Sequence, residues 1–339
     1  MFAEEYGYKK INMTKPIVSI IIPHFNRTIL LKDTLNSIKN QTFQHWEVIV
    51  VDDLSNNVEW EQLKTFEENK IKIIQRAEGL KGPSSCRNLG VKSASGKYLI
   101  FLDSDDLLES FCVEQRIAEI EKDPKIVMAI FKIMEFFKIP GDSNKIYNTD
   151  FPLNTITGQF IEGNNAWNVT CPIWNKNFFY KLGGFDESLL FMEDPELHIR
   201  ALIHSKNEIK ICYNKPADCY YRINYFDDSK QLFWYNSILY KINFFKKILK
   251  LIIDFNLQPE MKAHIRKGIL TLLKNFLFHR KNEFPELYES FKQLLKNSSV
   301  FSNFEIIWIN YLVDTGYSKN YILQKLKIKG ISYSLLPGK

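Results

Sequence analysis

Apolar residues near the start of the chain form first a continuous run and then a helical pattern. Residues 17–22 are almost all branched apolar side chains, and residues 28–40 place Leu31, Leu35 and Ile38 three or four positions apart. A short apolar run followed by this spacing predicts a buried strand and then an amphipathic helix. The segment therefore predicts one strand-helix unit.

Three more apolar runs predict further strands, at residues 46–51, 71–74 and 98–102. The first ends in Asp52-Asp53, and the last ends in Asp103-Ser104-Asp105-Asp106. Strands that are apolar throughout and separated by helices favour a mainly parallel sheet covered on both faces. Such sheets bind ligands at the carboxyl ends of their strands, so both acidic groups are expected at a binding edge.

The pattern changes in the second half of the chain. A helix is expected between residues 109 and 123, and another at 195–203 would begin with Pro195 at the favoured first position. Residues 141–174 are rich in Asn, Gly and Thr and look less regular. From residue 231 onward the apolar spacing is helical, most clearly at about 238–255. An α/β part followed by a helical part is the expected architecture.

Composition limits the class of protein. With 45% hydrophobic and 25% charged residues over 339 positions, the chain is long enough for a large globular domain and a smaller one, and disorder is not expected. The five cysteines are scattered singly, which favours free thiols over a zinc site or a redox pair. No apolar run of about 20 residues occurs, and charges interrupt the first ten residues, so we expect a protein that stays in the cytosol.

The net charge of +6 is unevenly distributed. The segment from Lys230 to Lys339 has 18 basic and 7 acidic residues, whereas the rest has 27 and 32. A basic, aromatic-rich C-terminal part is compatible with peripheral contact to an anionic membrane at its inner face. Oligomerisation through residues 230–339, or simple packing of these helices on their neighbours, explains the pattern as well, and no nucleic acid is expected as a partner.

Asp103 and Asp105 are the first candidates for chemistry. They follow an apolar strand directly, and their hard carboxylate oxygens suit Mg²⁺ or Mn²⁺ bound against phosphates. A metal there would neutralise a departing diphosphate. The alternative is a solvated acidic turn that caps the next helix.

Several short motifs occur in a fixed order. They are Ser19-Ile-Ile-Ile-Pro23-His-Phe-Asn26-Arg27, Val50-Val-Asp52-Asp53-Leu-Ser55, Gly82-Pro-Ser-Ser-Cys-Arg87-Asn88-Leu-Gly90, the Asp103-Ser-Asp105 triplet, and Gly183-Gly-Phe-Asp186-Glu187 with Glu193-Asp194. In these motifs the chain resembles glycosyltransferase family 2, inverting enzymes of the GT-A fold, over about residues 16–222. The resemblance implies a Rossmann-like, mixed but mainly parallel sheet with flanking helices, plus a helical C-terminal extension.

The resemblance also implies which residues hold a nucleotide-sugar. These are Pro23, Phe25, Asn26, Asp52, Asp53, Gly82, Arg87, Asn88, Asp103 and Ser104. Asp53 is the expected base-reading carboxylate, because a carboxylate can accept the imide N–H of uracil. A helix N-cap is the alternative role for Asp53, and an unrelated surface position is the alternative for Arg87.

The remaining roles concern the metal and the proton. The resemblance implies Asp105, with Asp103, as ligands of Mn²⁺ or Mg²⁺, and Asp106 as support either for the turn or for the water shell of the metal. Asp194 matches the catalytic base of the family, which takes the proton of the acceptor hydroxyl in an inverting transfer. Glu193 is expected to orient the sugar or acceptor, and a plain helix cap is the alternative for Asp194.

The sequence departs from the family pattern at two places. The usual Asp-Gly-Ser loop is replaced by Leu54-Ser55-Asn56-Asn57, so the ribose loop is expected to differ. After Tyr220-Tyr221-Arg222, where many relatives have a His, the chain has Ile223-Asn224. A third contact to metal or diphosphate is therefore unassigned, and His198 and His204 are expected to be structural residues on a helix.

Together these observations predict three parts: an N-terminal extension (1–15), a catalytic domain (16–229) and a helical domain (230–339). The catalytic domain would divide into a nucleotide-sugar half, about 16–109, and an acceptor half, about 110–229. The expected activity is transfer of a sugar from a nucleotide-diphosphate donor, a UDP-sugar, to a hydroxyl of a glycan or lipid-linked acceptor in bacterial surface polysaccharide synthesis.

Two other functions compete with this one. A sugar nucleotidyltransferase would need a glycine-rich phosphate loop after the first strand, and residues 23–27 contain no glycine. A non-catalytic nucleotide-binding scaffold is the second alternative. The presence of Asp103, Asp105 and Asp194 together argues against it.

Overall fold

The structure is a computed structural model of the chain that describes residues 15–223 and 231–314. These residues form two compact units that are interleaved along the sequence. The first contains the residues up to Thr149, Trp167–Glu187 and the residues from His204 to 223; the second contains Asp150–Ala166, Ser188–Ile203 and the helices after residue 230. Nearly all of the predicted N-terminal extension lies outside the described residues, and the predicted domain boundaries stay predictions.

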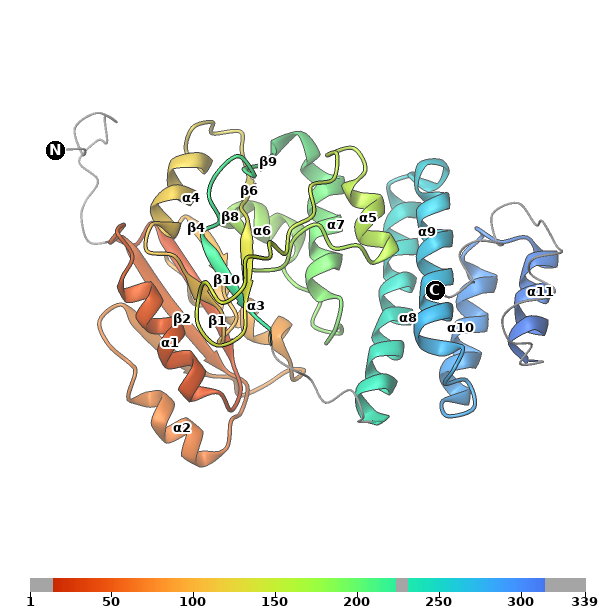
Figure 1. The fold of residues 1–339 in the computed structure, drawn as a ribbon, viewed down its shortest axis with the longest axis horizontal. Coiled ribbons are helices and arrows are strands. Elements are labelled where there is room, and N and C mark those ends of the chain that lie inside the picture. Colours follow the sequence, from red (N-terminus) through yellow and green to blue (C-terminus); the bar gives the residue numbers. More distant parts are fainter. Residues whose placement is uncertain (1–14, 224–230, 315–339) are drawn as a thin grey trace. The chain divides into compact units, whose positions relative to one another are not determined.

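A parallel half-sheet forms the core of the first unit (Figure 1). Its strands are β1 (Val18–His24), β2 (Trp46–Asp52), β3 (Ile71–Gln75) and β4 (Tyr98–Phe101), in the order β3-β2-β1-β4. In register, Ile21 lies between Ile49 of β2 and Phe101 of β4, and all three are fully buried. The four strands predicted from the apolar runs are thus confirmed, because burial on both faces is what a continuous apolar run indicates.

The same sheet continues with three shorter strands that complete a seven-stranded mixed sheet. β8 (Pro172–Asn175) runs antiparallel to both β4 and β6 (Met128–Ile130), and β6 pairs in parallel with β9 (Ile209–Ile211). The prediction of a mixed, mainly parallel sheet is confirmed. The strands of this half have only three or four residues each, which is too short for a periodic signal in the sequence.

Helices cover the sheet, and one of them approaches it very closely. α1 (Thr28–Lys39) buries the three apolar residues that predicted it, and α2 (Asn57–Lys64), α4 (Cys112–Ile120) and α6 (Lys176–Leu182) are further helices of this unit. α3 (Pro83–Ser93) packs on β1 and β2, where a Cβ at Gly90 would come within 2.4 Å of Cγ2 of Ile21. Only glycine fits this approach without a shift, so Gly90 fixes α3 against the sheet.

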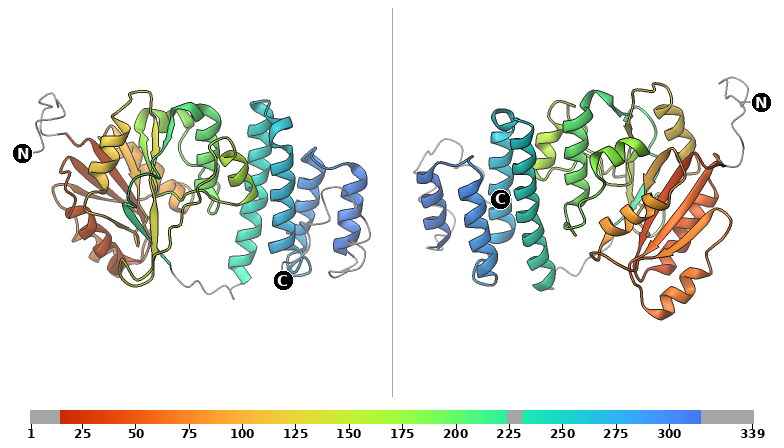
Figure 2. Two further views of the ribbon diagram at one scale, coloured as in Figure 1. Left: turned by 45° about the horizontal axis from the view of Figure 1, so that its top comes forward. Right: turned by 180° about the vertical axis from the view of Figure 1, so that it is seen from behind.

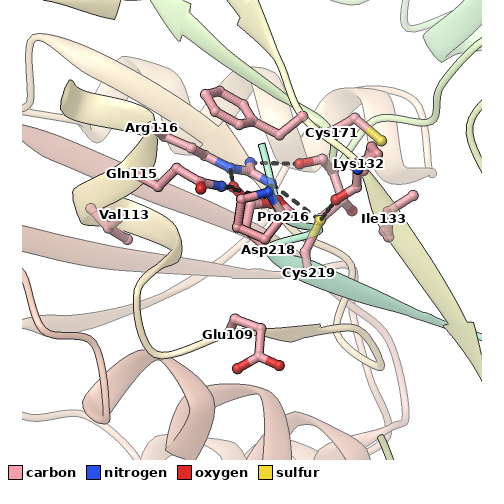
Figure 3. A network of polar contacts seen from close by, with 12 residues as sticks. Glu109, Val113, Gln115, Arg116, Lys132, Ile133, Cys171, Pro216, Asp218 and Cys219 are labelled. Carbon is pink, nitrogen blue, oxygen red and sulfur yellow. Dashed lines mark hydrogen bonds and ion pairs between the residues drawn. The ribbon is translucent and has the colours of Figure 1, made fainter. Parts of the chain in front are cut away.

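A second, three-stranded sheet lies beside the end of β4. β10 (Cys219–Arg222) pairs antiparallel with β5 (Leu107–Leu108) and parallel with β7 (Ile133–Phe136). A buried ion pair anchors it, because Nη2 of Arg116 on α4 lies 2.7 Å from Oδ1 of Asp218, just before β10. Figure 3 shows the Arg116 guanidinium facing Asp218 and Cys219. β10 thereby places Arg222 next to the turn that follows β4.

The second unit is helical. It contains α5 (Ile156–Glu162), most of α7 (Glu193–Ser205), α8 (Gln231–Asp254), α9 (Gln258–Leu272), a π-helical turn (Leu273–Leu277), α10 (Pro285–Asn297) and α11 (Asn303–Asp314), and the 3-10 turn Lys206–Glu208 follows α7. Helices α8 to α11 lie side by side, which Figure 2 shows from two directions. Among the described residues, none of the helices combines the length and apolar character that crossing a membrane requires.

One expected element bound was wrong. α7 begins at Glu193, not Pro195, because Glu193, Asp194 and Glu196 all lie in its first turn, where carboxylates suit the positive end of the helix dipole. α8 begins at Gln231, the residue from which helical spacing was expected, and aromatic contacts such as that of Tyr235 with Phe284 hold its first turns. The stretch 141–174 contains the helix α5, which is stabilised by packing on α9.

Candidate active site

Most of the predicted donor-site residues meet at the carboxyl edge of the parallel strands. They come from the end of β1 (Pro23, Phe25, Asn26), the end of β2 (Asp52, Asp53), the N-cap and middle of α3 (Gly82, Arg87, Asn88) and the end of β4 (Asp103, Ser104, Asp105). The ends of β1 and β2 are tied together, since the Asp53 amide donates to the His24 carbonyl at 2.8 Å. One sheet edge therefore collects residues from four motifs.

Asp52 organises the loop that departs from the family pattern. Its carboxylate is fully buried and accepts hydrogen bonds from the Ser55 amide at 3.0 Å, from the Ser55 hydroxyl, and from Nε2 of Gln75 at 3.1 Å. The Ser55 hydroxyl in turn accepts from the Asn26 amide at 2.9 Å. Asn26 and Leu54 both have positive φ, 50° and 62°, a conformation that Asn tolerates and Leu rarely adopts. The loop is thus held in one shape by Asp52.

Asp53 fixes a second loop. One of its oxygens accepts from Nε of Arg76 at 2.6 Å and the other from the Gly82 amide at 3.0 Å. Arg76 is buried and also donates to two backbone carbonyls of the following loop, at 2.8 and 2.9 Å. In the same loop the Lys81 ammonium lies 3.8 Å from the ring centre of Phe25, whose side chain is 42% exposed. Base reading by Asp53 stays a prediction, and each oxygen keeps a lone pair for one further donor.

Arg87 and Asn88 face different partners. Nη2 of Arg87 donates to Asp103 at 2.7 Å, and its guanidinium lies 5.2 Å from the ring centre of Phe185. The Asn88 amide is used by the turn after α6: its oxygen accepts from the Phe185 amide, and its nitrogen donates to the Phe185 carbonyl and to Glu187, each at 2.9 Å. Asn88 therefore holds the turn that contains Phe185, whose ring Arg87 contacts, and a contact of Asn88 with a nucleotide stays a prediction.

The turn after β4 brings carboxylates and arginines together. Nη1 of Arg27 donates to Oδ2 of Asp105 at 2.8 Å, and Nε of Arg222 donates to the Asp105 carbonyl at 2.9 Å. Asp106 is fully buried and accepts from the Arg222 amide at 3.0 Å and the Thr170 hydroxyl at 3.2 Å. Burial, followed by the charges of Asp103 and Asp105, raises the pKa of Asp106 well above its ordinary value. Asp106 thus supports the turn, while the other two carboxylates remain at the edge.

The residues of this turn fit one half of a divalent-cation site. Asp103 and Asp105 supply hard oxygen ligands, and the Asp103 side chain is 33% exposed. Ser104 is buried, and its carbonyl accepts from the Thr34 hydroxyl at 3.1 Å, which fixes the turn between the two carboxylates. Within residues 15–223 and 231–314 no cluster of three or more His, Cys, Asp or Glu side chains could hold a metal alone. A cation here would need the phosphate oxygens of a ligand or water as additional ligands.

Glu193 and Asp194 lie elsewhere in the architecture. They form the first two positions of α7, and both are half-buried. They belong to the second unit, so their roles as orienting residue and base stay predictions. His198 and His204 are on the same helix, as expected, and His198 is buried with its ring 5.5 Å from that of Phe160.

Sequence reasoning did not assign four residues that the structure places at this edge. They are Arg27, Arg76, Glu187 and Arg222, each bonded to a predicted site residue or to the turn after β4. Arg76 had a usable signal, because it directly follows β3 and so lies at the same sheet edge as Asp52. Arg222 lies 117 positions from Asp105 in the sequence, and no local pattern reports such a pairing.

Comparison with known proteins agrees with this geometry. Residues 19–181 match the model of the family described as glycosyl transferase family 2. An uncharacterized glycosyltransferase of Rickettsia bellii is 39% identical over 185 residues, which are 52% of this chain and 25% of that protein. The Escherichia coli UDP-Glc:alpha-D-GlcNAc-diphosphoundecaprenol beta-1,3-glucosyltransferase WfgD is 34% identical over 107 residues, 32% of this chain and 42% of that protein. The chain thus spans less than half the length of these two curated relatives.

A solved structure resembles most of the chain. The crystal structure of S. aureus TarS 1–349 in complex with UDP-GlcNAc superposes with a TM-score of 0.60, covering 83% of this chain and 80% of that chain at 20% identity. At this identity the likeness concerns the fold. The predicted GT-A architecture, with its mixed sheet and C-terminal helices, is confirmed.

Proposed function

Because residues 19–181 match the model of glycosyl transferase family 2, we propose that the chain is an inverting glycosyltransferase that moves a sugar from a nucleotide-diphosphate donor to an acceptor hydroxyl. The observation that carries this proposal is the turn after β4, where Asp103 and Asp105 lie at the same sheet edge as Asp52 and Asp53. Ligands of parallel α/β sheets bind at this edge. Two carboxylates there suit a cation that accompanies a diphosphate.

A UDP-sugar is the proposed donor. Phe25 offers an exposed ring for stacking a base beside the Asp53 carboxylate, which can accept the uracil imide N–H. WfgD takes UDP-Glc by its name, and TarS was crystallised with UDP-GlcNAc. Neither name identifies the sugar that this chain transfers, which depends on pocket residues of its own.

Asp103 and Asp105 would hold Mn²⁺ or Mg²⁺, which when bound neutralises the charge of the departing diphosphate. Asp194 is the proposed general base that takes the proton of the acceptor hydroxyl, and Glu193 would orient the sugar or acceptor. Arg87 keeps Asp103 in place through their 2.7 Å hydrogen bond. One base suffices, because an inverting transfer needs a single proton removed from the attacking hydroxyl.

The acceptor is proposed to be a glycan or a lipid-linked sugar in bacterial surface polysaccharide synthesis. The name of WfgD specifies a GlcNAc-diphosphoundecaprenol acceptor for that protein, which supports the lipid-linked class. A basic C-terminal part, with 18 basic and 7 acidic residues from Lys230, suits work at the anionic inner face of a membrane. Self-association through the same helices is the competing role.

The test is a donor panel of UDP-, GDP- and dTDP-sugars with Mn²⁺, comparing wild type with Asp105→Ala and Asp194→Ala. We expect turnover of a UDP-sugar, a loss of about 10²–10⁴-fold in Asp194→Ala, as is usual for a general base, and UDP binding retained in that variant. Pyrophosphate release from UTP and a sugar phosphate would instead indicate a nucleotidyltransferase. Unchanged activity in Asp194→Ala would refute Asp194 as the general base. If wild type binds none of the donors, the non-catalytic scaffold becomes the better assignment.

A further inference from the structure

Three guanidinium groups surround the turn after β4. Arg27 binds the Asp105 carboxylate, Arg87 binds the Asp103 carboxylate, and Arg222 binds the Asp105 carbonyl. The carboxylates proposed to hold a cation are therefore already neutralised by the protein itself. A divalent cation binds Asp105 more tightly if the arginine paired with it moves to another partner, because the guanidinium occupies one carboxylate oxygen and its positive charge repels the cation.

Two of the three arginines are held too firmly to exchange. The Arg87 side chain is 3% exposed and lies over Phe185. Arg222 donates to the Asp105 carbonyl at 2.9 Å and lies 4.4 Å from the ring centre of Phe136, and its backbone amide binds Asp106. Moving either of them would break contacts that do not involve the two metal-binding carboxylates.

Arg27 differs from both. Its side chain is 44% exposed, and among the described residues its guanidinium has no hydrogen-bond partner other than Asp105. Its backbone is fixed, because Arg27 is the N-cap residue of α1 and its carbonyl accepts from the Leu31 amide at 3.0 Å. The backbone of Arg27 is therefore fixed at the sheet edge, whereas its long side chain is exposed and has one hydrogen-bond partner. The guanidinium can move without leaving the edge.

We propose that Arg27 is a diphosphate-binding residue of the donor site that exchanges Asp105 for the donor's phosphates. Without ligand, Arg27 neutralises Asp105. When a divalent cation and a nucleoside diphosphate bind, Arg27 releases Asp105 to the cation and donates its N–H groups to phosphate oxygens, which match its forked geometry. This inference rests on the proposed function. It adds the Arg27 guanidinium, which follows β1, as a group that neutralises charge on the leaving diphosphate.

The experiment separates contacts to the base from contacts to the diphosphate. Calorimetry would measure the Kd of UDP and of uridine, both with Mn²⁺, for wild type, Arg27→Gln, Arg27→Lys and Lys32→Gln. Lys32 is a matched control, because it is an exposed cation on the same helix. We expect Arg27→Gln to raise the Kd of UDP about tenfold (about 1.4 kcal/mol) and to leave the Kd of uridine unchanged. Arg27→Lys should fall between, and Lys32→Gln should change neither value by more than about twofold.

A second readout tests the exchange itself. Mn²⁺ alone, titrated without nucleotide and followed by electron paramagnetic resonance, should bind Arg27→Gln several-fold more tightly than wild type, since Asp105 is no longer neutralised. Equal or weaker Mn²⁺ binding would refute the exchange. If Arg27→Gln leaves the Kd of UDP unchanged, or raises the Kd of uridine as much as that of UDP, the diphosphate contact is refuted. The proposed function would still stand in that case, provided that wild type binds UDP. If wild type binds neither compound, the proposed function fails and this inference fails with it.

Discussion

The buried ion pair between Arg116 and Asp218 should be among the costliest places to alter in the first unit. Both side chains are fully buried, and the guanidinium donates to Asp218 at 2.9 and 2.7 Å, to the Thr170 carbonyl at 2.7 Å and to Sγ of Cys219 at 3.1 Å (Figure 3). Arg116→Met keeps most of the side-chain volume but removes all four contacts. Asp218 would then be a buried carboxylate whose remaining side-chain donors are Gln115, at 3.2 Å, and the weakly donating thiol of Cys112.

The expected cost is about 3–5 kcal/mol, the usual effect of removing one partner of a buried ion pair. A domain has only about 5–15 kcal/mol of unfolding free energy, so this change should approach the limit of folding. Arg116→Met combined with Asp218→Val should recover most of the loss, because the double variant leaves no unpaired charge. The contrast between the single and double variants distinguishes an unpaired charge from poor packing.

Urea unfolding followed by tryptophan fluorescence would measure these values. A background with Trp234→Phe and Trp308→Phe leaves four of the six tryptophans, all in the first unit, so the signal reports that unit. Lys64→Met is the control, since the pair of Lys64 with Glu61 is exposed and should contribute less than about 1 kcal/mol. A loss below about 1 kcal/mol in Arg116→Met, or a double variant no more stable than the single one, would contradict this reasoning.

Two further variants test other parts of the fold. A hydrogen bond from Arg266 lowers the pKa of Glu305 to about 2, against an ordinary value of 4.5, so its stabilising contribution is present above pH 4.5 and disappears as the pH falls toward 2. Glu305→Gln should therefore unfold at a lower temperature than wild type at pH 7 and at a similar one near pH 2; a gap independent of pH would exclude this linkage. Gly90→Ala should cost about 1–3 kcal/mol in urea unfolding, because its Cβ would lie 2.4 Å from Ile21, and a neutral or stabilising effect would show that α3 can move away.

The parallel half of the sheet was predictable because its signals are local and long. β1 and β2 have seven residues each and are buried almost throughout, and the helix α1 has its buried residues at the spacing that predicted it. The antiparallel half was not predictable, because β6 and β9 have three residues each and pair across about eighty positions. Short strands of this kind are defined by their neighbours rather than by their own pattern.

The candidate site was predictable to a similar degree. Paired carboxylates at two strand ends predicted that these residues share one sheet edge, because strand direction alone places them together. The arginines that bind them were not assigned, since Arg27 and Asp105 are 78 positions apart and Arg222 and Asp105 are 117 apart. Which carboxylate an arginine meets depends on the packing of distant elements, and a single sequence does not specify it.

The polar contacts at this edge distinguish two kinds of residue: those exposed enough to contact a nucleotide-sugar directly, and those that position another side chain. The oxygen and the nitrogen of the Asn88 side-chain amide both bond to the turn that contains Phe185, and the Phe185 ring contacts the Arg87 guanidinium. A change at Asn88 would therefore alter Arg87 and disturb donor binding even without any contact to the nucleotide. Phe25 and Arg27, by contrast, are exposed at the same edge, so each can contact a ligand without first losing more than one partner. Comparing uridine with UDP distinguishes these two kinds of residue, because a displaced turn should weaken both ligands whereas a lost phosphate contact weakens only UDP.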